Sequence, residues 1–120
     1  MGIKNKKDVQ ILVVDNNRQL TDTIVEMLTR CGYSASGAYG GMEGIKRFQE
    51  GDFQLVVTDL KMPDVDGMDL LKAVKGIDGR VPVVIITGYG TIKKAVEAIK
   101  TGAYDFIEKP LSLDKVLLSI

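Results

Sequence analysis

The sequence predicts one α/β domain with a doubly wound, five-stranded parallel sheet and helices on both faces. Five apolar or small-residue segments alternate with five stretches whose apolar residues recur at helical spacing. This alternation is typical of parallel strands joined by helical crossovers. No linker, repeat or low-complexity segment divides the 120 residues, a length typical of one domain.

Three of the predicted strands are almost continuously apolar, which indicates burial on both faces. They are 9–14, the run 55–57 that leads into Asp59, and 81–86, where Pro82 stands near the beginning. The segments 34–39 and 104–108 are less apolar and suit the edges of the sheet. Right-handed crossovers then favour the strand order 2-1-3-4-5.

The first three predicted helices lie between these strands. The first has apolar residues at 20, 24, 27, 28 and 31, with Asn17 as N-cap and Gly32 as a left-handed stop. The second is opened by Gly40 and Gly41, carries Met42, Ile45 and Phe48, and is closed by Gly51. The third is marked by Met68, Leu71 and Val74 and frays through 76–79.

The last two predicted helices follow Thr91 and Ser112, which are candidate N-caps. In the fourth, Ile92, Ala95, Val96 and Ile99 have the spacing of one helix face, and Gly102 is the stop. The fifth has covered only about two turns when the chain ends on Ile120. We therefore expect one domain over 1–120, with a solvated basic tail at 1–7 and a final helix cut short from a longer chain.

The composition of the chain excludes several classes of function. Lys+Arg 16 against Asp+Glu 16 leaves no basic excess for direct contact with nucleic acid. The absence of histidine leaves carboxylates, hydroxyls and lysines for any chemistry. The single cysteine, Cys31, fits a small core residue, and no apolar run has membrane-spanning length. These observations favour a reducing cytoplasm.

Polar residues stand at the predicted carboxyl ends of four strands. Asp15 and Asn16 follow the first strand, Asp59 the third, Thr87 the fourth and Lys109 the fifth. The strand order brings these ends to one crevice, where open α/β sheets bind ligands. Two close carboxylates favour a cation such as Mg²⁺ between them, and an ammonium and a hydroxyl suit the oxygens of a phosphoryl group. A carboxylate can also accept that group as an aspartyl phosphate.

Four spaced motifs carry a resemblance to a known family. They are V-V-D-N-N at 13–17, V-V-T-D-L-K-M-P-D-V-D-G at 56–67, I-I-T-G-Y-G at 85–90 and A-Y-D-F-I-E-K-P at 103–110. In order and spacing the chain resembles the receiver domain of two-component response regulators, which has a flavodoxin-like (βα)5 fold. The run from Thr87 to Pro110 looks most like receivers of the nitrogen-regulatory class, which activate through an alternative sigma factor.

The resemblance implies a role for each site residue. Asp59 would be the phosphoacceptor, and Asp15, Asp59 and the Lys61 backbone carbonyl would hold Mg²⁺ or Mn²⁺. Thr87 would bond the phosphoryl oxygen and Lys109 would pair with its charge. Phe106 occupies the aromatic switch position of the family. The alternative is that its ring only packs in the core, as is true of roughly half of the aromatic residues on short strands.

The resemblance also implies partners. A sensor histidine kinase would donate the phosphoryl group, and the face 91–120 would change its partner preference. The output would be an ATPase domain and a DNA-binding helix-turn-helix in the same parent chain, and a homodimer through the last two helix-strand units is a further expectation. The domain would be a bacterial signalling switch and not an enzyme beyond assisting its own phosphorylation and dephosphorylation.

Asn16 departs from the family pattern, which usually has a second acidic residue there. An amide oxygen still ligates Mg²⁺, and we expect weaker metal binding with phosphorylation retained. The alternative is a receiver-like module that binds partners without phosphorylation. A flavodoxin-type carrier is disfavoured because Asp15, Asn16 and Asn17 would repel a phosphate that lacks a metal. The remaining acidic residues of the loop, Asp64, Asp66 and Asp69, fit loop and helix-start positions, and Met42, Met62 and Met68 fit packing.

Overall fold

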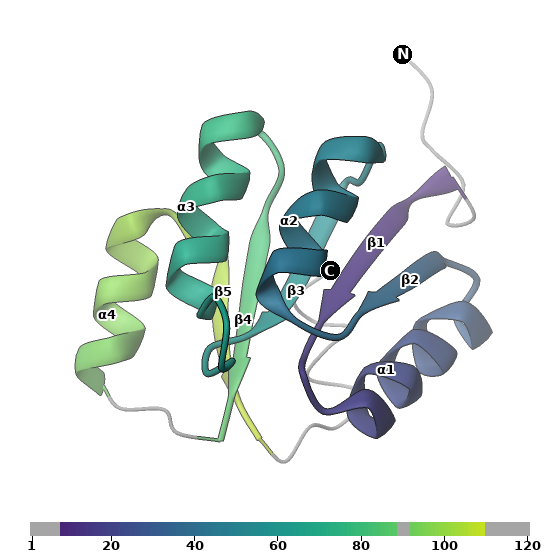
Figure 1. Cartoon of the computed structure of the whole chain (residues 1–120), viewed down its shortest axis with the longest axis horizontal. Coiled ribbons are helices and arrows are strands. Elements are labelled where there is room, and N and C mark those ends of the chain that lie inside the picture. Colours follow the sequence, from purple (N-terminus) through teal and green to yellow (C-terminus); the bar gives the residue numbers. More distant parts are fainter. Residues whose placement is uncertain (1–7, 89–91, 110–120) are drawn as a thin grey trace.

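Strands and helices alternate along the chain in the computed structural model, which describes residues 8–88 and 92–109. The elements are β1 (Gln10–Val14), α1 (Arg18–Arg30), β2 (Ser34–Ala38), α2 (Gly41–Glu50), β3 (Leu55–Asp59), α3 (Gly67–Ile77), β4 (Val83–Thr87), α4 (Ile92–Thr101) and β5 (Asp105–Glu108) (Figure 1). The predicted basic tail, the Thr91 cap and the helix after Ser112 lie outside the described residues.

The five strands form one parallel sheet in the order β2-β1-β3-β4-β5. The predicted fold class and strand order are therefore confirmed, including β2 and β5 at the edges. Every residue of β3 and β4 is buried, as is all of β1 after Gln10. The near-continuous apolar runs were the correct signal for central strands.

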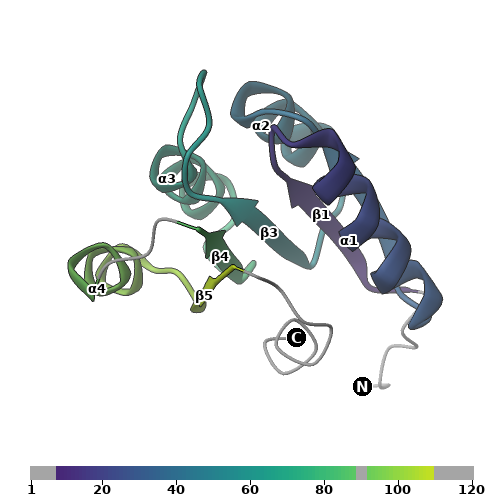
Figure 2. The ribbon, with the colours of Figure 1, turned by 90° about the horizontal axis from the view of Figure 1, so that it is seen from below.

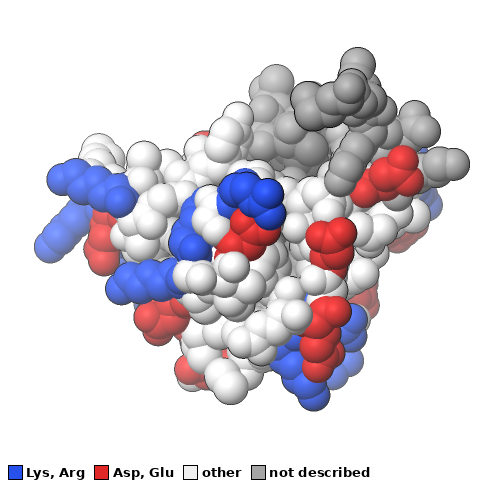
Figure 3. All heavy atoms as spheres, turned by 90° about the horizontal axis from the view of Figure 1, so that it is seen from above, with Lys and Arg blue, Asp and Glu red and all other residues white. Residues whose placement is uncertain are grey.

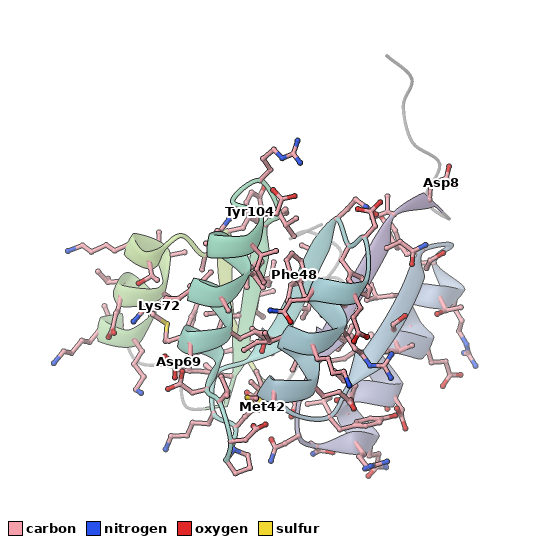
Figure 4. All side chains as sticks on the ribbon, turned by 45° about the horizontal axis from the view of Figure 1, so that its top comes forward. Asp8, Met42, Phe48, Asp69, Lys72 and Tyr104 are labelled. Atoms are coloured by element: carbon pink, nitrogen blue, oxygen red, sulfur yellow. The ribbon has the colours of Figure 1, made fainter. Side chains whose placement is uncertain are left out.

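Two hydrophobic clusters lie on opposite faces of this sheet. Alternate residues of the central strands point to each: Leu12, Val56 and Ile85 to one, and Ile11, Val57 and Ile86 to the other. Helices α2 and α3 pack side by side on the first face, whereas α1 contributes Ile24 and Leu28 to the second (Figure 1). Phe48 of α2 points into the first cluster (Figure 4).

The helix ends follow the predicted chemistry in most places. Asn17 caps α1 by accepting a hydrogen bond from the Leu20 N–H at 3.1 Å, and Gly32 has the left-handed φ of 99° expected after a helix. One prediction was wrong: α3 does not fray from residue 76 but continues to Ile77, where the Asp78 N–H donates the closing hydrogen bond to the Val74 carbonyl at 2.8 Å.

The expectation for Met42 also requires correction, and the α4 stripe faces a direction that the sequence left open. The stripe at Ile92, Val96 and Ile99 is turned largely outward, with 86%, 47% and 48% of each residue exposed, and Ala98 is the buried residue of α4. Periodicity identifies the stripe but not the direction it faces, and α4 lies at the edge of the molecule beside α3 and β5 (Figure 2). Met42 is 61% exposed, so packing was the wrong interpretation there, whereas Met62 is buried.

Candidate functional site

The predicted site residues come together at the carboxyl edge of the sheet, the edge that Figure 2 views. Asp15 follows β1, Asp59 ends β3 and Thr87 ends β4, and β3 lies between the other two strands. Lys109 follows β5 and donates its backbone N–H to the Thr87 carbonyl at 2.9 Å. Asp15, Asp59 and Thr87 are all buried.

Lys109 bridges the two carboxylates. Its Nζ lies 3.2 Å from Asp15 Oδ2 and 3.5 Å from Asp59 Oδ1, over a separation of 94 residues in sequence between Lys109 and Asp15. One ammonium balances only one of two buried negative charges. The site therefore carries a residual negative charge that favours a further cation.

Asp15 is oriented by the turn that joins β1 to α1. Its Oδ1 accepts a hydrogen bond from the Asn17 N–H at 2.9 Å, and its carbonyl accepts one from the fully buried Thr21 hydroxyl at 2.8 Å. Its own N–H donates to the Ala38 carbonyl. Thr21 was not predicted, because nothing in its local pattern indicates that its hydroxyl reaches back to the strand end.

Asp59 is held by the beginning of the loop that follows it. Its Oδ1 accepts from the Leu60 N–H at 2.9 Å, and the Gly67 N–H donates to the Leu60 carbonyl at 2.7 Å. A Cβ at Gly67 would lie 2.3 Å from the Asp59 carbonyl oxygen. Only glycine permits the start of α3 to approach the site backbone this closely.

Burial raises the pKa of the Asp59 carboxyl above its usual value, and the nearby Asp15 carboxylate raises it further. Lys109 and the Leu60 N–H lower the same pKa, but they only partly offset these effects. The charged form of Asp59 is thus poorly satisfied by the protein alone.

The donor set fits a hard divalent cation. Within residues 8–88 and 92–109, no group of three or more His, Cys, Asp or Glu side chains could hold a metal. A cation at this edge would be held by the two carboxylates of Asp15 and Asp59, a backbone oxygen and water, an all-oxygen set that Mg²⁺ accepts. In the sequence, Asn16 follows Asp15 directly and Lys61 comes two residues after Asp59. Both Asn16 and Lys61 are exposed.

Phe106 is partly buried on β5 and packs against the hydrophobic cluster that contains Ile85, its partner in the strand register. This placement agrees with both alternatives left open by the sequence. The ring occupies an inward position, and a switch role stays a prediction.

The charges elsewhere are mixed. On the face opposite the site, Lys and Arg side chains lie among Asp and Glu, with no continuous basic surface (Figure 3). Among the described helices, none has the length and apolar character needed to cross a membrane.

Fold and site together define a class: doubly wound α/β domains that present paired acids, a hydroxyl and an ammonium at the carboxyl edge. The chain belongs to the response regulator receiver domain family of two-component systems, whose family model matches residues 11–120. The resemblance carried by the four motifs is confirmed.

Bacterial transcriptional regulators are among the similar proteins. The chain is 36% identical over 114 residues to the transcriptional regulatory protein ZraR of Klebsiella oxytoca, covering 95% of this chain and 26% of that protein. The solved structure of NtrX from Brucella abortus, in complex with ADP, has a TM-score of 0.84 at 35% identity, covering 91% of this chain and 25% of that one.

A response regulator structure from Burkholderia pseudomallei contains a phosphorylated aspartic acid, a calcium ion and citrate. It has a TM-score of 0.88 at 28% identity, and the match covers 93% of this chain and 66% of that one. The similarity to NtrX agrees with the nitrogen-regulatory class predicted from residues 87–110. This chain spans about a quarter of the length of the curated relatives it matches.

Proposed function

We propose that this domain is a phosphorylation-controlled switch in which Asp59 accepts a phosphoryl group from a phosphohistidine of a sensor kinase in the cytoplasm. The observation that carries the proposal is the bridged acid pair: Asp15 and Asp59 are buried side by side, with Lys109 Nζ within 3.5 Å of both. A purely structural pair of acids would have no need for this arrangement at an open sheet edge.

In the transfer, a carboxylate oxygen of Asp59 forms a bond to phosphorus while the P–N bond to the donor imidazole breaks. The bonding electron pair leaves with the imidazole nitrogen, which takes a proton. Lys109 already lies against the carboxylate and neutralises charge on the transferred group, and the Thr87 hydroxyl donates to one of its oxygens. The low-dielectric surroundings of Asp59 strengthen both interactions.

The proposed metal ligands are Asp15, Asp59 and the Lys61 carbonyl, with Asn16 as a weak or altered ligand. Bound Mg²⁺ or Mn²⁺ would supply charge neutralisation on the phosphoryl oxygens. The Burkholderia protein has the same fold and contains a calcium ion and a phosphorylated aspartic acid, which supports the proposal of a divalent cation and an aspartyl phosphate in this domain.

The proposed output runs through α4 and β5. Thr87 ends β4, the strand that precedes α4, and Phe106 is paired with Ile85 of β4 in the register of β5. Movement of Thr87 toward a phosphoryl group would change the packing of Phe106 and the exposed α4 stripe. The proposed partners of this surface are a second receiver and an output domain of the parent chain, which would have ATPase and DNA-binding parts.

The test is intact mass after incubation with acetyl phosphate and Mg²⁺. Wild type should gain the mass of one phosphoryl group, and Asp59→Ala should gain none. A wild type that stays unmodified by acetyl phosphate and by every sensor kinase of its genome would favour the alternative, a receiver-like module that works without phosphorylation. Equal modification of Asp59→Ala would move the acceptor to another residue.

A further inference from the structure

Asp64 makes a contact that its sequence neighbourhood does not indicate. It lies in the loop between β3 and α3, yet its Oδ1 accepts a hydrogen bond from the Gly41 N–H at 3.1 Å and its Oδ2 accepts from the Met42 N–H at 3.0 Å. Both donors belong to the first turn of α2. Figure 4 shows Met42 at this end of α2, near the start of α3 where Asp69 lies.

Helix α2 has no side-chain cap of its own. Its N-cap position is Gly40, which makes no side-chain capping bond, so the first N–H groups of the helix lack a local partner. Asp64 supplies that partner from more than twenty residues downstream. A carboxylate at this position is also favoured by the positive end of the helix dipole.

The backbones of the loop and α2 are in close contact as well. A Cβ at Gly41 would lie 2.3 Å from the Val65 carbonyl oxygen and 2.6 Å from Val65 Cβ. Gly41 is buried by this contact. The loop therefore rests directly on the first residue of α2, and Asp64 fastens the two together.

Helix α2 in turn contacts the strand that delivers Asp15. A Cβ at Gly44 would lie 2.9 Å from a methyl group of Val14, the residue before Asp15. One turn of α2 thus touches Val14 on β1 and is bound by Asp64 on the loop that contains Lys61. These two segments lead to Asp15 and to the Lys61 carbonyl, two of the proposed metal ligands.

We propose that Asp64 is a positioning residue for the divalent-metal site: by capping α2, it holds the loop that carries the Lys61 carbonyl in place relative to Asp15. This inference rests on the proposed function, because it takes Asp15, Asp59 and Lys61 as the metal ligands. Hydrogen bonds from Met42, Val65 and Gly41 also lower the pKa of the Asp64 carboxyl, so the capping form is the charged one at neutral pH.

The experiment measures Mn²⁺ binding to the unphosphorylated 120-residue chain by calorimetric titration. Asp64→Ala removes both capping acceptors, whereas Asp64→Asn removes the same charge but keeps one acceptor oxygen. Asp69→Asn is the matched control, since Asp69 is exposed in the first turn of α3 and no capping bond from its side chain is seen. These variants separate geometry from charge.

We expect Asp64→Ala to weaken Mn²⁺ binding by about fivefold, the lower end of couplings between linked sites. Asp64→Asn should fall between Asp64→Ala and wild type, and Asp69→Asn should stay near wild type. In phosphorylation by acetyl phosphate, Asp64→Ala should raise the Mg²⁺ concentration for half-maximal rate, while the rate at saturating Mg²⁺ returns close to wild type. Amide hydrogen exchange at Gly41 and Met42 should accelerate in Asp64→Ala.

Unchanged Mn²⁺ affinity in Asp64→Ala, with wild type binding the metal normally, would overturn the positioning role and leave the proposed function intact. Equal weakening in Asp64→Ala, Asp64→Asn and Asp69→Asn would overturn it too, because charge alone would then explain the effect. A wild type that binds no Mn²⁺ and gains no phosphoryl group would instead refute the proposed function.

Discussion

At the scale of single residues, Asp59 carries a charge that the metal-free fold stabilises poorly. Because folding raises its pKa, this group contributes stability while it is protonated, below its usual value of 3.8. That contribution is lost as the pH rises through the raised pKa. At neutral pH the ionised carboxylate therefore destabilises the folded state, and a bound cation would offset this effect.

Asp59→Asn should accordingly stabilise the metal-free domain at neutral pH. The amide removes the charge and keeps an oxygen for the Leu60 N–H, while Lys109 keeps its contact with Asp15. We expect the Tm in EDTA to rise by about 4 °C, equivalent to about 1 kcal/mol for a domain of this size. The gain should shrink as the pH is lowered toward the carboxyl pKa. A lower Tm for Asp59→Asn at neutral pH would mean that Lys109 outweighs burial.

Asn16 is the second residue whose chemistry can be tested directly. Asn16→Asp adds a carboxylate next in sequence to Asp15, so Mg²⁺ should bind more tightly. We expect the Mg²⁺ concentration for half-maximal phosphorylation by acetyl phosphate to fall severalfold, with Asp59 still the modified residue. Asn17→Asp controls for charge near the turn, since Asn17 is occupied in capping α1. An unchanged half-saturating concentration would contradict the proposed role of Asn16.

Residue by residue, the sequence predicted those site members that stand at strand ends. Asp15, Asp59, Thr87 and Lys109 each stand at the end of a predicted strand, and parallel strands deliver such residues to one edge. Asp64 and Thr21 were missed because their partners lie outside any local motif. A capping signal is normally sought immediately before a helix, and at α2 that position holds Gly40.

At the scale of elements, periodicity predicted where helices lie better than how they are turned. The stripe of α1 is buried at Ile24 and Leu28, because β1 and β2 lie beneath it. The equivalent stripe of α4 faces outward, because that helix contacts mainly β5 and α3 and buries only Ala98. Helical spacing cannot distinguish a face that packs within the chain from one that awaits a partner.

At the scale of the whole molecule, the site exists only because of the chain topology. Lys109 and Asp15 are 94 residues apart and meet through the strand order β1-β3-β4-β5. The same topology leaves α4 beside the last strand, at the opposite edge from β2. Strand β5 thereby lies between β4, which ends in Thr87, and α4, which carries the exposed apolar stripe.

That surface predicts association on phosphorylation. Ile92, Val96 and Ile99 of α4 are between 47% and 86% exposed, as expected of a protein interface. We expect the wild type to be monomeric by light scattering without phosphodonor and dimeric with acetyl phosphate and Mg²⁺. Val96→Gln should prevent dimerisation while Asp59 is still phosphorylated, whereas Met42→Gln, which changes an exposed apolar residue on α2, should not. Burying a polar amide at position 96 would remove an apolar contact between the two copies. If the dimer still forms in Val96→Gln, the α4 stripe is therefore not its interface.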